Sequence, residues 1–291
     1  MSQQTRAYLW ASCAVALWST VATAFKISRR HATPIELLLW ASLTSTVALF
    51  AILLGQGKLA ALRIGSPRLL AHSALAGFLN PCLYYLVLFE AYARLPGQQA
   101  QPLNYTWAIA LALLSIPLLK QKIRVVGLLA MLISFLGVAV ISTRGDVLSL
   151  RPTDPLGVSL ALGSSLFWAF FWILNLKDRR NEVVKLFWSF SWGTLFVIIV
   201  ATTTGELRLP SRPALAGALY VGLFEMGVTF VLWLKALQLS RTTAQVSNLI
   251  FLAPFASLIF LNRIAGEDIH VSSVLGLALI VGGILLQRRL G

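Results

Sequence analysis

The sequence predicts an all-α membrane protein of ten transmembrane helices, arranged as two inverted repeats of five helices each. Three observations predict this class. Only 12% of the 291 residues are charged and 58% are hydrophobic, whereas soluble domains usually carry about 25% charged residues. Apolar runs of about 20 residues, the length needed to cross a bilayer, recur along the whole chain. Short motifs of the first half also recur in the second half at a nearly constant spacing.

The apolar runs define the expected membrane spans. Their ranges, in chain order, are 7–25, 34–54, 69–93, 97–119, 123–143, 155–176, 184–204, 214–238, 243–262 and 271–287. The first run has the position of a signal peptide, but it is long, lacks a clear cleavage site and precedes nine similar runs. We therefore interpret it as the first span. The connections are too short for a soluble domain, so we expect the protein to act within or across the membrane.

The net charge of +14 raises the question of a nucleic-acid partner. However, the Lys and Arg residues lie almost entirely at the ends of apolar runs and are not interleaved with aromatics, which is typical of topology signals. The side that holds both termini carries more Lys and Arg, so we expect both termini in the cytoplasm. The cluster of Lys26, Arg29 and Arg30 on the opposite side argues against this orientation. No nucleic-acid partner is expected.

The two halves of the chain resemble each other in order and position. The matching positions are Trp18 with Trp168, Arg29-Arg30 with Arg179-Arg180, Gly77 with Gly222, Asn80 with Glu225, Glu90 with Lys235, and Ala100-Gln101-x-x-Asn104 with Ala244-Gln245-x-x-Asn248. These pairs fall on equivalent spans and predict a duplicated unit of five spans, covering residues 1–146 and 147–291. Because five is odd, the second copy enters the membrane in the opposite orientation. Inverted repeats are typical of transporters with a site at the repeat interface.

The third and fourth spans carry many polar side chains for membrane segments. The polar, aromatic and proline positions within 77–117 are Asn80, Pro81, Tyr84, Tyr85, Glu90, Gln98, Gln99, Gln101, Pro102, Asn104, Tyr105 and Trp107. Polar groups are costly in lipid and normally face the interior of a helix bundle or a watery cavity. The two spans therefore indicate the wall of a pathway. The alternative is that these groups only hydrogen-bond one helix to another.

Several aromatic residues are expected near the middle of their spans, where the aromatic belts of the membrane interfaces cannot explain them. They are Trp18, Tyr84, Tyr105, Trp107, Trp168 and Trp172. We expect them to surround one midplane cavity that suits a flat or bulky apolar ligand with a polar end. Asn80, four residues before Tyr84 on one helical face, and Asn248 are expected to orient that polar end. The alternative is that each ring only packs against a helix or lipid. The residues expected in the belts are Tyr8, Trp10, Trp40, Trp188 and Tyr220.

Three ionisable residues inside the spans are candidates for a coupling or charge site. Glu225 is the best candidate for a proton-sensitive or ligand-orienting group, because it is expected at depth. Glu90 and Lys235 lie about one turn from a span end, where a long side chain can reach water. The first span has no carboxylate. We therefore favour a neutral or zwitterionic cargo over a lipophilic cation.

Catalytic function is not expected from the sequence. Glu206, Glu267 and Asp268 lie at span edges, and no set of Ser, His and Asp gathers at depth. There is no Gly-rich phosphate loop or nucleotide motif, so we expect no cofactor and no step driven by ATP. Cys13 and Cys82 lie inside spans, and the three His residues lie far apart at span edges. No metal site is therefore expected.

These features resemble the EamA-type members of the drug/metabolite transporter superfamily over essentially the whole chain. Besides the ten spans in two repeats, the resemblance is carried by Trp18, Lys26, Ala100-Gln101, Pro254, and the glycines of the fifth and tenth spans, Gly127, Gly137, Gly276, Gly282 and Gly283. More narrowly, Tyr84, Tyr105-x-Trp107 and Trp168 look like the YddG-type exporters of aromatic amino acids. The sequence departs from the family after the fourth span, where Gln121 or Lys122 replaces the carboxylate that Glu267 supplies after the ninth.

The resemblance implies a basket of two inverted five-helix halves around a central cavity, which spans one, three, four, six, eight and nine enclose. It also implies export of aromatic amino acids and related small metabolites across a bacterial inner membrane by alternating access. Two other functions stay open. One is a broad-specificity exporter of small amino acids or purine-type metabolites by proton antiport, and the other is a channel-like or scaffold membrane protein. The expected partners are the small-molecule substrate and membrane lipid, and the oligomeric state stays open.

Overall fold

The protein is helical, without strands, in the residues that the computed structural model describes, which are 1–63, 66–95, 100, 103–149, 154–265 and 271–290. The α-helices are α1 (Gln3–Ser28), α2 (Pro34–Gly55), α3 (Pro67–Gly77), α4 (Tyr84–Arg94), α6 (Trp107–Leu119), α7 (Val125–Ser142), α8 (Pro155–Lys177), α9 (Glu182–Thr203), α10 (Arg212–Val221), α11 (Val228–Leu239), α12 (Thr243–Ser247), α13 (Leu252–Ala265) and α14 (Val271–Leu290). The 3-10 helices are η1 (Leu59–Leu62), η3 (Val147–Ser149) and η5 (Asn248–Phe251), and the π-helical segments are η2 (Phe78–Leu83) and η4 (Gly222–Gly227). The predicted all-α class is confirmed.

Local sequence signals start several of these helices. Thr33, Ser66 and Asp154 each precede a Pro, and their side chains accept hydrogen bonds from backbone amides of the first turn. Ser211 does the same for α10. Such residues satisfy amides that have no partner within the helix, and Pro fits the first position because its missing N–H is not needed there. These signals explain why α2, α3, α8 and α10 begin close to the predicted span starts.

Eight helical runs in the described residues are long and apolar enough to cross a membrane. They are Gln3–Phe25, Pro34–Gly55, Pro67–Arg94, Val125–Ser142, Pro155–Lys177, Glu182–Thr203, Arg212–Leu239 and Val271–Leu290, and Leu103–Leu119 is a shorter apolar helix. The predicted span 243–262 is a series of α12, η5 and α13 instead of one α-helix. Pro254 gives a physical reason, because it lacks the amide that would bond to the carbonyl of Ile250. An integral membrane protein is confirmed, whereas ten crossings stay a prediction.

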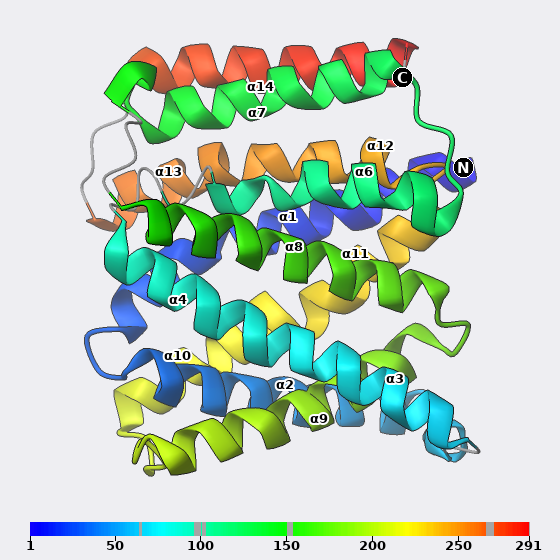
Figure 1. Cartoon of the computed structure of the whole chain (residues 1–291), viewed down its shortest axis with the longest axis vertical. Coiled ribbons are helices and arrows are strands. Elements are labelled where there is room, and N and C mark those ends of the chain that lie inside the picture. Colours follow the sequence, from blue (N-terminus) through cyan, green and yellow to red (C-terminus); the bar gives the residue numbers. More distant parts are fainter. Residues whose placement is uncertain (64–65, 96–99, 101–102, 150–153, 266–270, 291) are drawn as a thin grey trace.

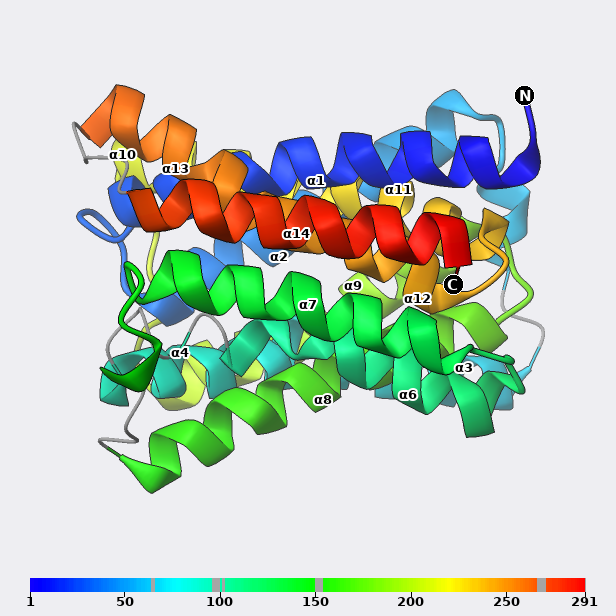
Figure 2. The same cartoon turned by 90° about the horizontal axis from the view of Figure 1, so that it is seen from above.

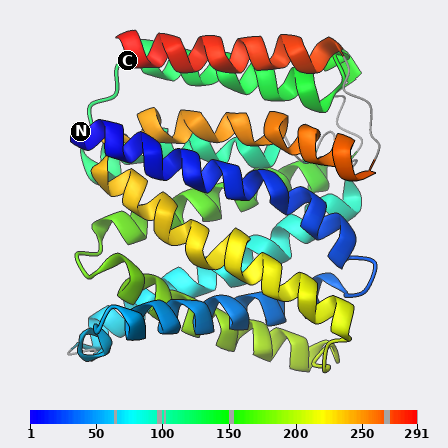
Figure 3. The same ribbon diagram turned by 180° about the vertical axis from the view of Figure 1, so that it is seen from behind.

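The helices lie roughly parallel in layers (Figure 1). α7 and α14 form one edge, and their glycines let the two backbones touch: a Cβ on Gly137 would lie 2.5 Å from the carbonyl oxygen of Gly276. Small residues permit such close packing of membrane helices. The opposite edge contains α2 and α9, and α1, α4, α6, α8 and α11 fill the centre. Figure 2, from above, and Figure 3, from behind, both show the two termini at the same end of the molecule.

Two long helices are interrupted at equivalent places in the two halves. The α3–η2–α4 run and the α10–η4–α11 run each contain a π-helical segment near the middle. At Gly77 the first run touches α9, where a Cβ would lie 2.6 Å from the amide nitrogen of Gly193. At Gly222 the second run touches α2, where a Cβ would lie 2.5 Å from the carbonyl oxygen of Ala41. Each half therefore packs its interrupted helix against the second helix of the other half.

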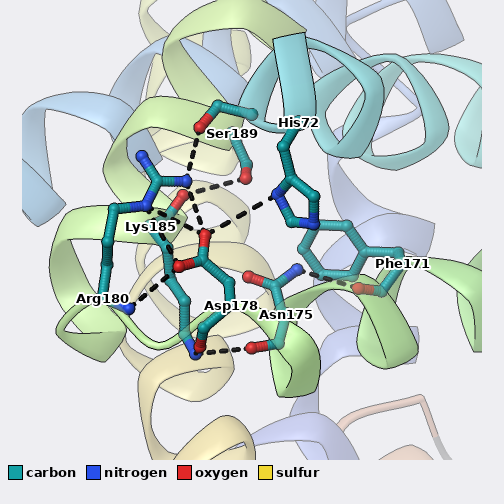
Figure 4. Close-up of polar contacts among 8 residues, drawn as sticks. His72, Phe171, Asn175, Asp178, Arg180, Lys185 and Ser189 are labelled. Carbon is teal, nitrogen blue, oxygen red and sulfur yellow. Dashed lines mark hydrogen bonds and ion pairs between the residues drawn. The ribbon is translucent and has the colours of Figure 1, made fainter. Parts of the chain in front are cut away.

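A buried polar cluster joins the turn between α8 and α9 to α3 (Figure 4). Lys185 is 1% exposed, and its Nζ donates hydrogen bonds to the backbone carbonyls of Asn175 and Asp178 at the end of α8. The Asp178 carboxylate accepts a hydrogen bond of 3.0 Å from Nε of Arg180. Nη2 of Arg180 also donates to Oγ of Ser73 on α3 at 2.7 Å. The cluster holds these three helices together at the end of the molecule that carries the termini.

Candidate functional site

A cavity of about 380 Å³ lies in the centre of the bundle. Its lining residues are Trp18, Val21, Phe25, Arg29, Tyr84, Tyr85, Leu88, Phe89, Tyr92, Asn104, Tyr105, Trp107, Trp168, Glu225, Ile250, Ala253 and Ser257. Arg29 and Tyr92 are exposed near the ends of α1 and α4 that point away from the termini, so they mark the mouth. The volume lies within the range of about 300–1,000 Å³ that is usual for small-molecule sites.

The walls of the cavity are aromatic rings from separate helices. The centroid of the Trp168 ring lies 4.3 Å from that of Tyr84, 5.8 Å from Trp107 and 6.2 Å from Trp18. Tyr84 also packs edge-on against Tyr85 at 4.7 Å. Ring pairs in such geometries are worth about 0.5–1.5 kcal/mol beyond their buried area. The rings therefore hold one another in place and present a firm apolar wall.

A second aromatic layer lies beneath the cavity, toward the end that carries the termini. The ring centroid of Trp233 lies 5.1 Å from that of Trp18 and 5.8 Å from that of Trp107. Phe230 lies 5.3 Å from Trp168, and both Trp233 and Phe230 are 0% exposed. This layer separates the cavity from the terminal end of the bundle.

Below the cavity, buried hydrogen bonds also link α6 to α12. The hydroxyl of Thr243 donates to Oγ of Ser115 at 2.9 Å, and the amide of Thr243 donates to Oε1 of Gln121 at 2.9 Å. Ser115 and Thr243 are both 0% exposed. The two helices come from opposite halves of the chain, so these hydrogen bonds fasten one half to the other.

Glu225 supplies the carboxylate of the cavity. It lies at the middle of the long helix Arg212–Leu239, inside η4, and is 9% exposed. The hydroxyl of Tyr85 donates a hydrogen bond of 2.8 Å to Oε1 of Glu225. Nε1 of Trp18 donates to the backbone carbonyl oxygen of Glu225 at 3.0 Å. Side chains from α1 and α4 therefore fix both the carboxylate and the backbone of this residue.

Two further polar groups lie on the cavity. The side-chain amide of Asn104 donates to the hydroxyl oxygens of Tyr84 and Ser164, both at 3.3 Å. Nε1 of Trp168 is buried and has no hydrogen-bond partner among the described residues. An unpaired buried donor of this kind is unfavourable.

Six of the residues identified from the sequence line the cavity, namely Trp18, Tyr84, Tyr105, Trp107, Trp168 and Glu225. The sequence places Tyr85 in the expected pathway wall but does not identify Tyr85, Phe89 or Tyr92 as binding residues, although spacings of four and three residues place them on one face of a helix. It identifies Arg29 as a topology signal and a repeated position, and Asn104 as part of the pathway wall and of a repeated motif. Only the fold shows that Arg29 and Asn104 line the cavity.

Asn80, Trp172 and Asn248 do not line the cavity. Asn80 is 0% exposed and leaves the helical conformation, with φ −153° and ψ 123°. The i, i+4 spacing predicts that Asn80 and Tyr84 share one helical face. This prediction is wrong, because the backbone of Asn80 is not helical. Asn248 is 1% exposed at the start of η5, and neither asparagine amide has a hydrogen-bond partner among the described residues. Trp172 is 0% exposed and packs against Phe230 at 5.1 Å.

Glu90 and Lys235 also lie away from the cavity. The side chain of Glu90 is 51% exposed and accepts a hydrogen bond of 2.7 Å from Nε of Arg94. Nζ of Lys235 lies 5.0 Å from the centroid of a Trp10 ring, a geometry that allows a cation–π interaction. Glu225 is thus the carboxylate that the described part of the chain places in the cavity.

Some predicted positions lie outside the described residues. They are Gln98, Gln99, Gln101, Pro102, Glu267 and Asp268, together with the side chain of Lys26. In the part of the chain that the structure describes, no group of three or more His, Cys, Asp or Glu residues could hold a metal ion.

Comparison with known proteins identifies the family. The sequence model of the EamA-like transporter family matches the chain twice, over residues 5–143 and 155–288. The chain belongs to the EamA-like transporter family. The family that the sequence resembles is therefore confirmed, and membership indicates membrane transport of a small molecule.

Proteins similar to this chain include three uncharacterized transporters. One from Clostridium kluyveri is 25% identical over 231 residues, which are 75% of this chain and 72% of the relative. One in the sor 3' region of Acidianus ambivalens is 27% identical over 205 residues, which are 69% of this chain and 78% of the relative. YvbV of Bacillus subtilis is 23% identical over 215 residues, which are 72% of this chain and 69% of the relative.

The overall fold of this EamA-like transporter also occurs in a solved structure. That structure, described only as the crystal structure of a protein, aligns with a TM-score of 0.84 at 21% sequence identity. The alignment covers 99% of this chain and 98% of the other chain. The two proteins therefore share a fold over their whole lengths.

Proposed function

We propose that this EamA-like transporter exports aromatic amino acids and related small metabolites across the bacterial inner membrane by alternating access. The observation that carries the proposal is the cavity, whose walls are mainly Trp, Tyr and Phe rings and whose charged groups are few. A mostly apolar pocket with a small number of placed polar groups suits a ligand that has an aromatic side chain and a polar end.

The proposed architecture is a basket of two inverted five-helix halves, residues 1–146 and 147–291. The family model matches once in each half, and the interrupted helices occupy equivalent places in the two halves. Both termini lie at one end of the molecule, as an even number of crossings requires. In transporters built this way the substrate site lies at the repeat interface near the midplane. Glu225, at the middle of its helix, and Tyr85, from the other half, meet in the cavity.

The direction of access follows from the cavity and the proposed topology. The mouth lies near Arg29 and Tyr92, while Trp233 and Phe230 lie between the cavity and the termini. With both termini in the cytoplasm, this conformation faces outward. Export then requires a second conformation in which the aromatic layer opens inward. We propose no cofactor.

A counterflow assay with purified protein in proteoliposomes tests the proposal. Vesicles loaded with phenylalanine should take up labelled phenylalanine, and tryptophan or tyrosine should compete more strongly than threonine, homoserine or a purine base. Equal competition by all of these compounds would favour a broad-specificity exporter of small metabolites. An equal leak of unrelated solutes would favour a channel-like protein, and no counterflow with any compound would contradict transport of this kind.

A further inference from the structure

We propose that Glu225 binds the protonated amino group of the substrate, so that the cavity selects aromatic compounds that carry a primary ammonium group. This inference rests on the proposed transport of aromatic molecules and adds a chemical requirement at one end of the substrate. The free hydrogen-bonding capacity of the carboxylate, the rings around it and the position of the other charge on the cavity favour an ammonium group at this place.

The carboxylate of Glu225 has room for further donors. Among the described residues it accepts one side-chain hydrogen bond, from the Tyr85 hydroxyl to Oε1, and it forms no ion pair with Lys, Arg or His. A carboxylate offers about four lone-pair sites on its two oxygens. Taking an ionised carboxylate out of water without a cation nearby is costly in free energy. Removing one partner of a buried ion pair is strongly destabilising for the same reason, because it leaves the other charge unpaired. An ammonium group with three N–H donors would offset this cost.

The rings around Glu225 also favour a positively charged group. Tyr85 and Trp18 both hydrogen-bond to Glu225, through its carboxylate and its backbone carbonyl. The centroid of the Trp168 ring lies 6.4 Å from that of Tyr85 and 6.2 Å from that of Trp18. Aromatic faces attract ammonium groups that come within about 6 Å of the ring centroid. A carboxylate among such rings is therefore a better site for a cation than for an anion.

The remaining charge on the cavity sets the orientation of a zwitterion. Arg29 is the basic residue among the described lining residues, and it is exposed at the mouth. An amino acid that places its ammonium group on Glu225 can direct its carboxylate toward Arg29 at the mouth. The opposite orientation would bring two carboxylates together, which is unfavourable.

Three ligands that differ by single groups test the inference. Phenylalanine has both charges, 3-phenylpropionate lacks only the amino group, and 2-phenylethylamine lacks only the carboxylate. Their binding to the purified full-length protein in detergent can be measured by isothermal titration calorimetry. We expect 3-phenylpropionate to bind about 10- to 100-fold more weakly than phenylalanine, the usual value of a hydrogen bond to a charged group.

The variant Glu225→Gln tests whether this preference comes from Glu225. It should weaken phenylalanine and 2-phenylethylamine by about the same 10- to 100-fold and leave 3-phenylpropionate nearly unchanged. Glu36→Gln is the matched control, because Glu36 lies in the first turn of α2 and does not line the cavity. It should leave the affinities of all three ligands unchanged.

Two results would overturn the inference while aromatic transport stands. One is equal affinity of the wild-type protein for phenylalanine and 3-phenylpropionate, which needs no variant and so does not depend on the folding of Glu225→Gln. The other is an equal loss of all three ligands in Glu225→Gln, which would assign the residue a structural role. If none of the three ligands binds the wild-type protein, the proposed function is wrong, and the inference is wrong with it.

Discussion

Tyr85 and Glu225 meet in the cavity, where the tyrosine hydroxyl donates a hydrogen bond of 2.8 Å to the carboxylate. The two residues are 140 positions apart and belong to the two long interrupted helices, one in each proposed half of the chain. A relative movement of the halves must change this contact. The bond therefore connects the polar centre of the cavity to the movement that alternating access requires.

The first prediction concerns the driving force. We expect transport to follow the substrate gradient, because Glu225 is the one carboxylate among the described lining residues and Glu90 is half exposed and paired with Arg94. A pH gradient imposed across proteoliposomes without a substrate gradient should therefore give no uphill accumulation. If accumulation occurs and Glu225→Gln abolishes it, facilitated transport is wrong and Glu225 is the coupling site.

The second prediction concerns the stability of the turn between α8 and α9. Lys185→Met keeps most of the side-chain volume but leaves two buried backbone carbonyls, of Asn175 and Asp178, without the Nζ donor. We expect a loss of about 1–3 kcal/mol in the free energy of unfolding, the usual cost of an unsatisfied buried group. Thermal unfolding in detergent measures it. Lys177→Met, at an exposed position on the last turn of α8, should change little. Equal melting temperatures for the two variants would contradict the prediction.

The third prediction concerns acid stability. Burial raises the pKa of Asp178, but the hydrogen bonds and charge of Arg180 outweigh burial and hold the pKa below its usual range. The unfolded chain then binds the proton more tightly, so the stability from Asp178 is complete above its unfolded pKa of about 3.9 and is lost as the pH falls through the lower folded value. Asp178→Asn should thus destabilise the protein at about pH 7, and this destabilisation should become smaller as the pH falls below about 3.9.

Melting temperatures of the wild type and Asp178→Asn across this range check the third prediction. His72 is a second ionisable residue in contact with Asp178, and its Nδ1 lies 3.7 Å from the Asp178 carboxylate. The comparison should therefore be made in a His72→Gln background. A destabilisation that is the same at both ends of the pH range would mean that the charge of Asp178 does not contribute.

The sequence predicts the helices and their order because composition, run length and capping residues are local properties. It also identifies most of the cavity rings, because an aromatic residue far from a membrane interface needs another explanation. Which face of a helix such a residue occupies is harder to predict. In α4 the regular spacing holds, and Tyr85 and Phe89 both line the cavity. Across η2 the regular spacing fails, because Asn80 has an extended backbone conformation. Residues before and after it therefore do not follow one continuous helical face.

The position of Asn248 illustrates the same limit. It matches Asn104 in the repeated motif, yet Asn104 lines the cavity and Asn248 is buried at the start of a 3-10 helix. Equivalent sequence positions therefore do not guarantee equivalent roles once local helix geometry differs. Arg29 and Tyr92 are absent from the predicted site for another reason. They lie at the ends of their helices, and only the fold brings them to one mouth, where Phe25 of α1 and Phe89 of α4 have ring centroids 6.4 Å apart.

The fourth prediction concerns the closed end of the cavity. The hydroxyl oxygens of Ser115 and Thr243 lie 2.9 Å apart on α6 and α12, and the two helices must separate if the protein opens inward. A Ser115→Cys and Thr243→Cys double variant, with Cys13→Ser and Cys82→Ala to remove the native thiols, should form a disulfide on oxidation. We expect oxidation to stop counterflow and a reductant to restore it.

Each single-cysteine variant is a control for the fourth prediction, because it cannot cross-link within the chain and should transport equally before and after oxidation. Cross-linking can be checked by the loss of free thiols in the double variant. Unchanged counterflow by a fully cross-linked protein would show that α6 and α12 do not separate during transport.

The fifth prediction concerns the aromatic walls. Trp107 and Trp168 are 4% and 3% exposed, come from opposite halves of the chain and line the cavity with ring centroids 5.8 Å apart. Trp188 is half-buried beside Phe187 and does not line the cavity. Truncating one wall should weaken binding of phenylalanine or tryptophan by about 1–3 kcal/mol, the usual value of burying a large apolar side chain, or about 5- to 150-fold in affinity.

Trp107→Ala and Trp168→Ala should therefore reduce counterflow of phenylalanine and tryptophan far more than Trp188→Ala, at matched levels of reconstituted protein. Loss of general packing would also lower activity, so melting temperatures must accompany the transport rates. Residual counterflow by the first two variants should shift toward smaller substrates such as threonine, because the space left by an indole no longer favours a ring. Equal losses for all three variants, in proportion to their melting temperatures, would mean that these tryptophans only hold the helices together.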